Sequence, residues 1–90
     1  MEAHLQINEL RKQIDQIDRE LTALFLRRME LAQEIGAEKR RLSLPVGDGD
    51  REREILDRVK AAAPPALHPA LETWFTTLFR LSRAQQGEQP

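Results

Sequence analysis

A long apolar seam with no helix breaker is the feature that most restricts how this chain folds. Large aliphatic side chains recur in alternating steps of four and three, the heptad pattern of a helix that packs along another helix. The seam positions are Leu10, Ile14, Ile17, Leu21, Leu24, Leu31 and Ile35. One member is missing, because Arg28 occupies the place between Leu24 and Leu31. The pattern predicts an α-helix over about residues 7–41.

This predicted helix is too long for a compact monomer of 90 residues. No proline interrupts the sequence before Pro45. At 1.5 Å per residue the helix is about 50 Å long, whereas a compact chain of this length has a radius of gyration of about 12 Å. Since the rest of the chain cannot cover the seam from end to end, we expect the long helix to pack against a second copy.

Turn signals divide the remaining sequence into two shorter helices. Residues 43–50 contain one Pro, two Gly and two Asp, and either Asp can cap the N-terminus of a new helix. The second helix is expected over about residues 50–63, where a Pro pair stops it. The third is expected over about residues 69–86, with Pro in its first turn. We therefore expect one all-α domain over residues 1–90.

The composition argues against several classes of function. Fourteen basic and 15 acidic residues give a net charge of −1, which provides no overall field to recruit nucleic acid or an anionic membrane. The absence of Cys excludes disulfides, thiolate metal sites and cysteine nucleophiles. His4 and His68 lie far apart without a carboxylate at ligand spacing, so we expect no metal site. Without a signal peptide or a membrane-spanning run, a cytoplasmic protein is expected.

The functional signal lies in polar side chains at inward-facing helix positions. Arg28 lies in the seam, and Lys39 follows eleven residues later, about 20° away around an ideal helix. Glu52 begins the inward face of the second helix, while Ser82 and Gln86 extend that of the third. Buried charge without a partner is costly, so such groups on three helices indicate an enclosed polar ligand.

Each of these residues also has a purely structural interpretation. Arg28 alone would be read as an interhelical ion pair that fixes register. Lys39, followed by two Arg, would complement the C-terminal dipole of its helix. Glu52 suits a helix N-terminus, and Ser82 and Gln86 would mark a fraying helix end. The functional interpretation therefore depends on the number, faces and order of these residues.

Four segments resemble the all-α chorismate mutases, and together they cover nearly the whole chain. They are LRKQIDQID at 10–18, RRMELAQEIGAEK at 27–39, LPVGDGDRERE at 44–54 and LSRAQQ at 81–86. The resemblance implies an intertwined homodimer with antiparallel long helices and two equivalent sites. It also implies the rearrangement of chorismate to prephenate in phenylalanine and tyrosine biosynthesis, without a cofactor.

The resemblance assigns the binding of the two substrate carboxylates to arginines. Arg28 would bind one carboxylate within its own chain, and Arg11 would bind the other across the dimer interface. Seventeen residues separate them, or about 25 Å along the helix, which is too far for one small ligand in cis. Ser82 and Arg51 would complete the carboxylate pocket.

The same resemblance assigns the reacting part of the substrate to four other residues. Lys39 and Gln86 would donate hydrogen bonds to the ether oxygen and act as the catalytic residues. Glu52 and the backbone around Asp48 would hold the ring hydroxyl. The reaction is intramolecular, so fixed donors suffice and no nucleophile, general base or metal is required.

Two alternative functions remain open from the sequence. An isochorismate pyruvate-lyase shares this helical architecture, although the intact set of Asp48, Arg51 and Glu52 favours the mutase. The other is a non-catalytic dimeric module that regulates or docks onto a shikimate-pathway enzyme, so such an enzyme is a further candidate partner. The products formed from chorismate and isochorismate distinguish these functions.

Overall fold

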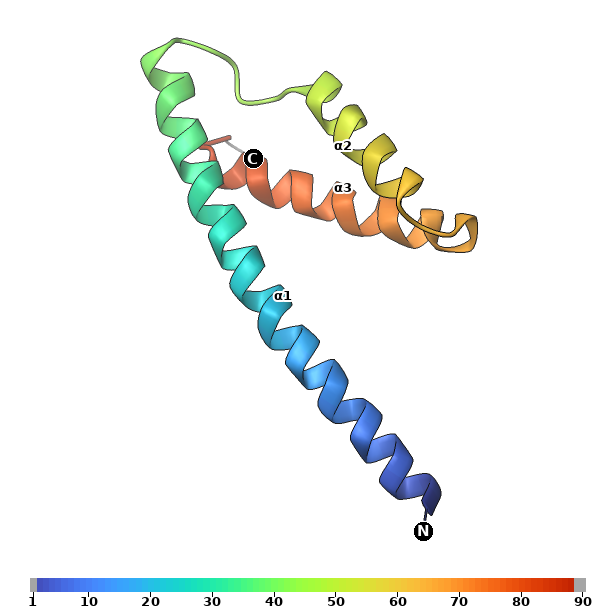
Figure 1. Ribbon diagram of the computed structural model, residues 1–90. Coiled ribbons are helices and arrows are strands. Elements are labelled where there is room, and N and C mark those ends of the chain that lie inside the picture. The colour runs from blue at the N-terminus through green and yellow to red at the C-terminus, as the bar shows by residue number, and fades with distance from the viewer. Residues whose placement is uncertain (1, 89–90) are drawn as a thin grey trace.

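In the computed structural model, which describes residues 2–88, the chain folds into three α-helices and one short 3-10 helix (Figure 1). In chain order these are α1 (Glu2–Arg41), α2 (Gly49–Ala61), η1 (Pro65–Leu67) and α3 (His68–Gln85). The predicted all-α class and the very long first helix are confirmed. None of the helices described here combines the length and the apolar character needed to cross a lipid bilayer.

Two helix ends differ from the prediction by two residues or more, and the others agree to within one residue. α1 begins at Glu2 instead of near Ile7. The prediction was based on the apolar seam, which starts at Leu10, but the residues before the seam contain no Gly or Pro and also support a helix. α2 ends at Ala61 instead of residue 63, because the N–H of Ala62 turns back to the carbonyls of Val59 and Lys60 and tightens the last turn.

The N-terminal half of α1 projects away from the rest of the chain (Figure 1). The molecule measures 61 × 26 × 22 Å and has a radius of gyration of 17.2 Å, well above the value of about 12 Å for a compact chain of this length. Every position of the predicted seam exposes 40–67% of its surface. A single chain therefore leaves the seam uncovered.

A small core forms where α3 packs against both α1 and α2. Among residues 4–88, whose side chains the structure describes, the buried apolar ones are Met29 and Ala32 on α1 and Phe79 on α3. The rings of Phe75 and Phe79 lie 6.0 Å apart between centroids. A core of this size contributes little stability by itself, which agrees with a chain that associates.

The connection between α1 and α2 reverses the chain direction and then starts a new helix. Ser43 adopts a left-handed conformation with φ of 58°, and the N–H of Leu44 donates to the carbonyl of Lys39 at 2.8 Å. Of the two Asp residues that the sequence offers as caps, Asp48 is the one used: its Oδ1 accepts from the N–H of Arg51 at 3.1 Å. The connection therefore ends in a capped N-terminus for α2.

Candidate active site

A cavity of about 460 Å³ lies where the C-terminal part of α1 meets the start of α2 and the end of α3. The site residues predicted from the sequence that line it are Arg28, Lys39, Asp48, Arg51, Glu52, Ser82 and Gln86. Its apolar lining comes from Leu31, Ala32, Ile35, Val46, Ile55 and Phe79. The fold therefore brings the polar groups of three separate inward faces to one place.

Arg28 presents a buried donor at this cavity. Its Nη1 is buried and has no hydrogen-bond partner among the described residues, and it makes no ion pair with another described side chain of its own chain. A buried cationic donor without an acceptor carries a desolvation cost. The site thus has an unmet requirement for an acceptor, which an anionic ligand would satisfy.

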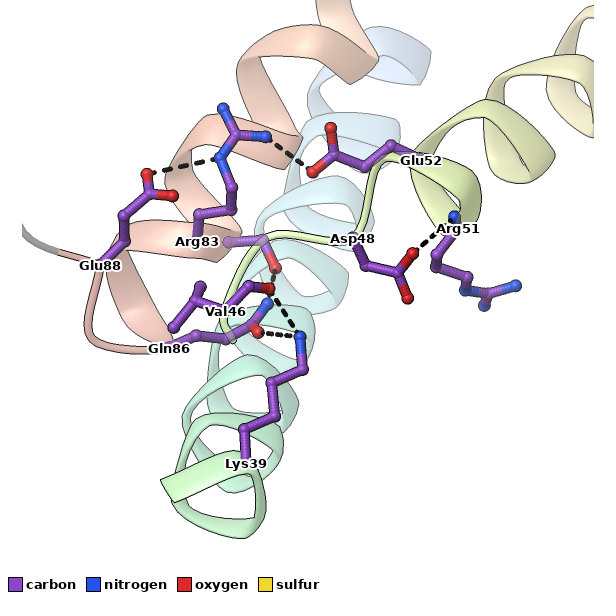
Figure 2. Close-up of polar contacts among 9 residues, drawn as sticks. Lys39, Val46, Asp48, Arg51, Glu52, Arg83, Gln86 and Glu88 are labelled. Carbon is purple, nitrogen blue, oxygen red and sulfur yellow. Dashed lines mark hydrogen bonds and ion pairs between the residues drawn. The ribbon is translucent and has the colours of Figure 1, made fainter. Parts of the chain in front are cut away.

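Lys39 and Gln86 form a polar pair on the cavity wall (Figure 2). The Lys39 Nζ donates to the carbonyl of Val46 and to Gln86 Oε1, both at 2.7 Å. This contact orients the Gln86 amide so that Nε2 points toward Ser82 Oγ, at a long 3.4 Å. An ammonium group has three N–H donors, so Lys39 keeps one donor and Gln86 keeps its amide N–H for an acceptor in the cavity.

The backbone of Gln86 is held tightly against α1. Gly36 lies opposite it, and a Cβ at this position would be 2.5 Å from the Gln86 carbonyl oxygen and 2.7 Å from its Cα. Arg40 Nη1 donates to the same carbonyl oxygen at 3.0 Å. Gln86 itself is only 8% exposed, so α1 fixes both the position and the burial of this residue.

The first turn of α2 supplies the opposite wall. Asp48 caps the helix with its side chain, and its carbonyl accepts from the N–H of Glu52 at 3.1 Å. Arg51 lines the cavity from an exposed position and pairs with Glu54 at 2.8 Å. Because both partners of that pair are well exposed, the pair is weak and leaves Arg51 free to turn toward a ligand.

Sequence reasoning missed one charged residue of this cavity, Arg83. Its Nη1 lies 2.6 Å from Glu52 Oε2, and its Nε lies 3.4 Å from Glu88 Oε1 (Figure 2). The hydrogen bond to Glu52 is the main cause that raises the pKa of Arg83 above its ordinary value. The sequence could have placed Arg83 on the inward face of α3, because Phe79, Ser82, Arg83 and Gln86 follow the i, i+3, i+4, i+7 spacing of one helix face, but it could not have shown the contact with Glu52.

Arg11 is the predicted site residue that this chain does not bring to the cavity. It is exposed on the projecting part of α1 and is absent from the lining. About 25 Å of helix separates it from Arg28. A role for Arg11 at the site therefore requires a second chain.

The lining suits a small ligand with several negative charges. Its basic side chains outnumber its acidic ones and are Arg28, Lys39, Arg51 and Arg83. The acidic members are Asp48 and Glu52. Guanidinium groups bind carboxylates through paired donors, while an ammonium and an amide can stabilise charge that develops on a single oxygen. Within residues 2–88, no group of three or more His, Asp or Glu side chains is arranged to hold a metal ion.

Comparison with known proteins identifies the family. Residues 10–87 match the family described as chorismate mutase type II. The chain belongs to the chorismate mutase type II family. The match includes every residue of the cavity lining and also Arg11.

Two curated relatives carry names that agree with this family. The bifunctional chorismate mutase/prephenate dehydratase of Aquifex aeolicus is 43% identical over 54 residues, which cover 60% of this chain and 15% of that protein. The chorismate mutase of Methanocaldococcus jannaschii is 38% identical over 52 residues, which cover 58% of this chain and 52% of that protein. This chain thus spans about half or less of the length of these relatives.

A solved structure shares the fold of this chorismate mutase type II chain. It is a conserved hypothetical protein from Pyrococcus furiosus, with a TM-score of 0.74 and 33% sequence identity. The similarity covers 90% of this chain and 95% of that one. The single long helix and two short helices therefore recur in a relative of nearly the same extent.

Proposed function

We propose that this all-α domain rearranges chorismate to prephenate. The observation that carries the proposal is the convergence, in one cavity, of the seven residues to which the sequence resemblance assigns roles at the site. The cavity volume of about 460 Å³ lies within the range of about 300–1,000 Å³ that is usual for small-molecule sites. We propose that the reaction serves phenylalanine and tyrosine biosynthesis in the cytoplasm.

The reaction breaks a C–O bond of the ether and forms a C–C bond within one molecule. It needs no group transfer to the protein, so the protein must hold the dianion in a compact chair-like form and stabilise charge on the departing oxygen. The N–H donors that Lys39 and Gln86 keep toward the cavity suit the ether oxygen. Even a millionfold acceleration requires that orientation and electrostatics together lower the activation free energy by about 8 kcal/mol.

The arginines bind the carboxylates of the substrate. The buried Nη1 of Arg28, which lacks an acceptor among the described residues, is suited to one carboxylate. Ser82 and Arg51 line the same cavity and complete that pocket. Glu52 and the backbone around Asp48 bind the ring hydroxyl at the opposite wall, which the start of α2 forms.

In a homodimer, Arg11 of the partner subunit binds the second carboxylate. Two observations support this assembly: the seam of α1 is exposed along its whole length, and Arg11 is too far along α1 to reach the cavity of its own chain. Antiparallel packing of two long helices would bring the N-terminal part of one helix beside the Arg28 and Lys39 of the other. Each dimer would then hold two equivalent sites.

The test is to add purified protein to chorismate and to follow chorismate loss together with prephenate formation. We expect prephenate to form, and Lys39→Ala to lose most of the activity. Lys60→Ala is the matched control, because Lys60 pairs with Glu72 outside the cavity. Failure to convert chorismate at any protein concentration would contradict the proposal, as would release of pyruvate from isochorismate without prephenate formation from chorismate.

A further inference from the structure

Two ion pairs join α2 to α3, and one of them lies on the cavity wall. Arg83 Nη1 on α3 lies 2.6 Å from Glu52 Oε2 on α2. The other cross-helix pair joins Lys60 and Glu72 at 3.0 Å, and neither of its residues lines the cavity. The two pairs have similar chemistry, so their different locations allow a structural role to be separated from a role in the site.

The contact with Arg83 determines what Glu52 can do. One carboxylate oxygen, Oε2, is occupied by the guanidinium, while no described residue donates a hydrogen bond to Oε1. A glutamate side chain loses considerable rotamer freedom when it is held in one orientation. Arg83 fixes that orientation before a ligand arrives and leaves one oxygen free to accept a hydrogen bond.

Arg83 also offsets the charge of Glu52 in a site that takes a dianion. An uncompensated carboxylate on the cavity wall would repel the carboxylates of the ligand, whereas a paired one does so much less. Both side chains of the pair keep part of their surface exposed, 27% and 28%, so solvent screening limits what the pair contributes to the stability of the fold. The position of the pair is therefore better explained by the site than by the fold.

We infer that Arg83 is a positioning residue, which acts through Glu52 and holds its carboxylate ready to accept the hydrogen bond of the substrate's ring hydroxyl. This inference rests on the proposed rearrangement of chorismate and on the role of Glu52 in it. Arg83 also lines the cavity, but one of its guanidinium nitrogens, Nη1, is already engaged by Glu52. If Arg83 acts through Glu52, its effect on the reaction depends on an intact carboxylate at that position.

The inference is tested by a double-mutant cycle between Arg83 and Glu52, measured as steady-state kinetics with chorismate. Because a hydroxyl is held alike in the ground state and the transition state, Arg83→Met should raise KM about tenfold and change kcat little. In the Glu52→Gln background the same replacement should change KM less than about twofold. Arg83→Lys should recover part of the loss, and Lys60→Met, the matched control, should leave KM unchanged.

Arg83→Gln is measured in both Glu52 backgrounds as a second replacement, and circular dichroism checks the fold of every variant. Equal effects of Arg83 replacement in the two backgrounds would overturn the inference while leaving the proposed function intact. Unfolding of both Arg83 variants beside a folded Lys60→Met would also overturn it, since it would make Arg83 a structural residue. A wild-type protein that forms no prephenate would instead overturn the proposed function, and this inference with it.

Discussion

The side-chain amide of Gln86 presents its two ends to different partners. Oε1 accepts from Lys39 at 2.7 Å, and Nε2 is left toward Ser82 and the cavity. A neutral amide keeps its donor throughout the ordinary pH range. If Gln86 donates to the ether oxygen, its contribution to the reaction does not titrate.

Gln86→Glu turns this position into a pH-dependent donor. A protonated carboxyl can accept from Lys39 with one oxygen and donate with the other, as the amide does. An ionised carboxylate has no donor. It also places negative charge beside the ether oxygen of the substrate, on which negative charge develops during the reaction. We therefore expect kcat of the variant to be low near neutral pH and to rise as the pH falls toward the ordinary pKa of a glutamate side chain.

The measurement is a pH profile of kcat for both proteins, over a range in which circular dichroism shows both folded. Wild type should show no matching rise toward acid pH. A variant as active as wild type in mildly alkaline buffer, or one without an acidic limb, would show that Gln86 does not contact the ether oxygen.

A site residue could be predicted from the sequence when a polar or charged side chain occupied a helix position that the apolar pattern reserves for an aliphatic one. Arg28 replaces an aliphatic residue in a regular seam, and that conflict marks it without any structure. Arg83 follows Ser82 directly and lies beside a polar helix end, where a charged residue looks ordinary. Its partner Glu52 is 31 residues away in sequence, and only the packing of α2 on α3 brings the two together.

The three helices and the faces that they share follow from local physics. Helical periodicity places Arg28 and Lys39 on one face of α1, and the structure brings both to the cavity. The close approach of α3 to α1 could not be read from the sequence, because it depends on a contact between Gly36 and the backbone of Gln86, distant in the chain. A lone Gly in a helix predicts only a weak point in that helix.

Gly36→Ala should weaken the docking of α3 on α1. The gain in helix propensity is about 1 kcal/mol, whereas forced overpacking typically costs about 1–3 kcal/mol. Since the new Cβ would meet backbone atoms of Gln86, which cannot rotate away, we expect the cost to prevail. Denaturant unfolding should give a lower free energy of unfolding, and kcat should fall because Gln86 is displaced.

Gly47→Ala provides the matched control for this replacement. A Cβ at Gly47 meets nothing within 4 Å, and the residue does not adopt a positive φ. Its stability and activity should stay close to those of wild type. If Gly36→Ala has the same free energy of unfolding and the same kcat as Gly47→Ala, the end of α3 tolerates displacement. The close packing of Gln86 against Gly36 would then have no functional consequence.

For the whole molecule, the exposed seam leads us to expect that folding is coupled to association. A chain with a radius of gyration of 17.2 Å and few buried apolar residues lacks the core of an independent globule. Burial of the seam in a dimer would supply the missing apolar contact. The thermal midpoint should therefore rise with protein concentration, because association stabilises the folded state by mass action.

Analytical ultracentrifugation over the same range of protein concentrations measures the fraction of dimer and checks this prediction. We expect activity to fall together with the dimer fraction on dilution. A folded monomer that stays active at low micromolar concentration would contradict the intertwined assembly, even if the thermal midpoint depended on concentration for another reason.

The proposed assembly predicts that each site contains residues from both chains. Arg11→Ala and Lys39→Ala should each be nearly inactive, because every site in either homodimer lacks one required side chain. When the two variants are co-expressed equally and pair at random, half of the dimers are mixed. In a mixed dimer one site is intact and the other lacks both residues, so activity per chain should recover to about one quarter of wild type if the sites do not couple. Mixed dimers are verified with two different affinity tags, and their failure to recover activity would place Arg11 outside the partner's site.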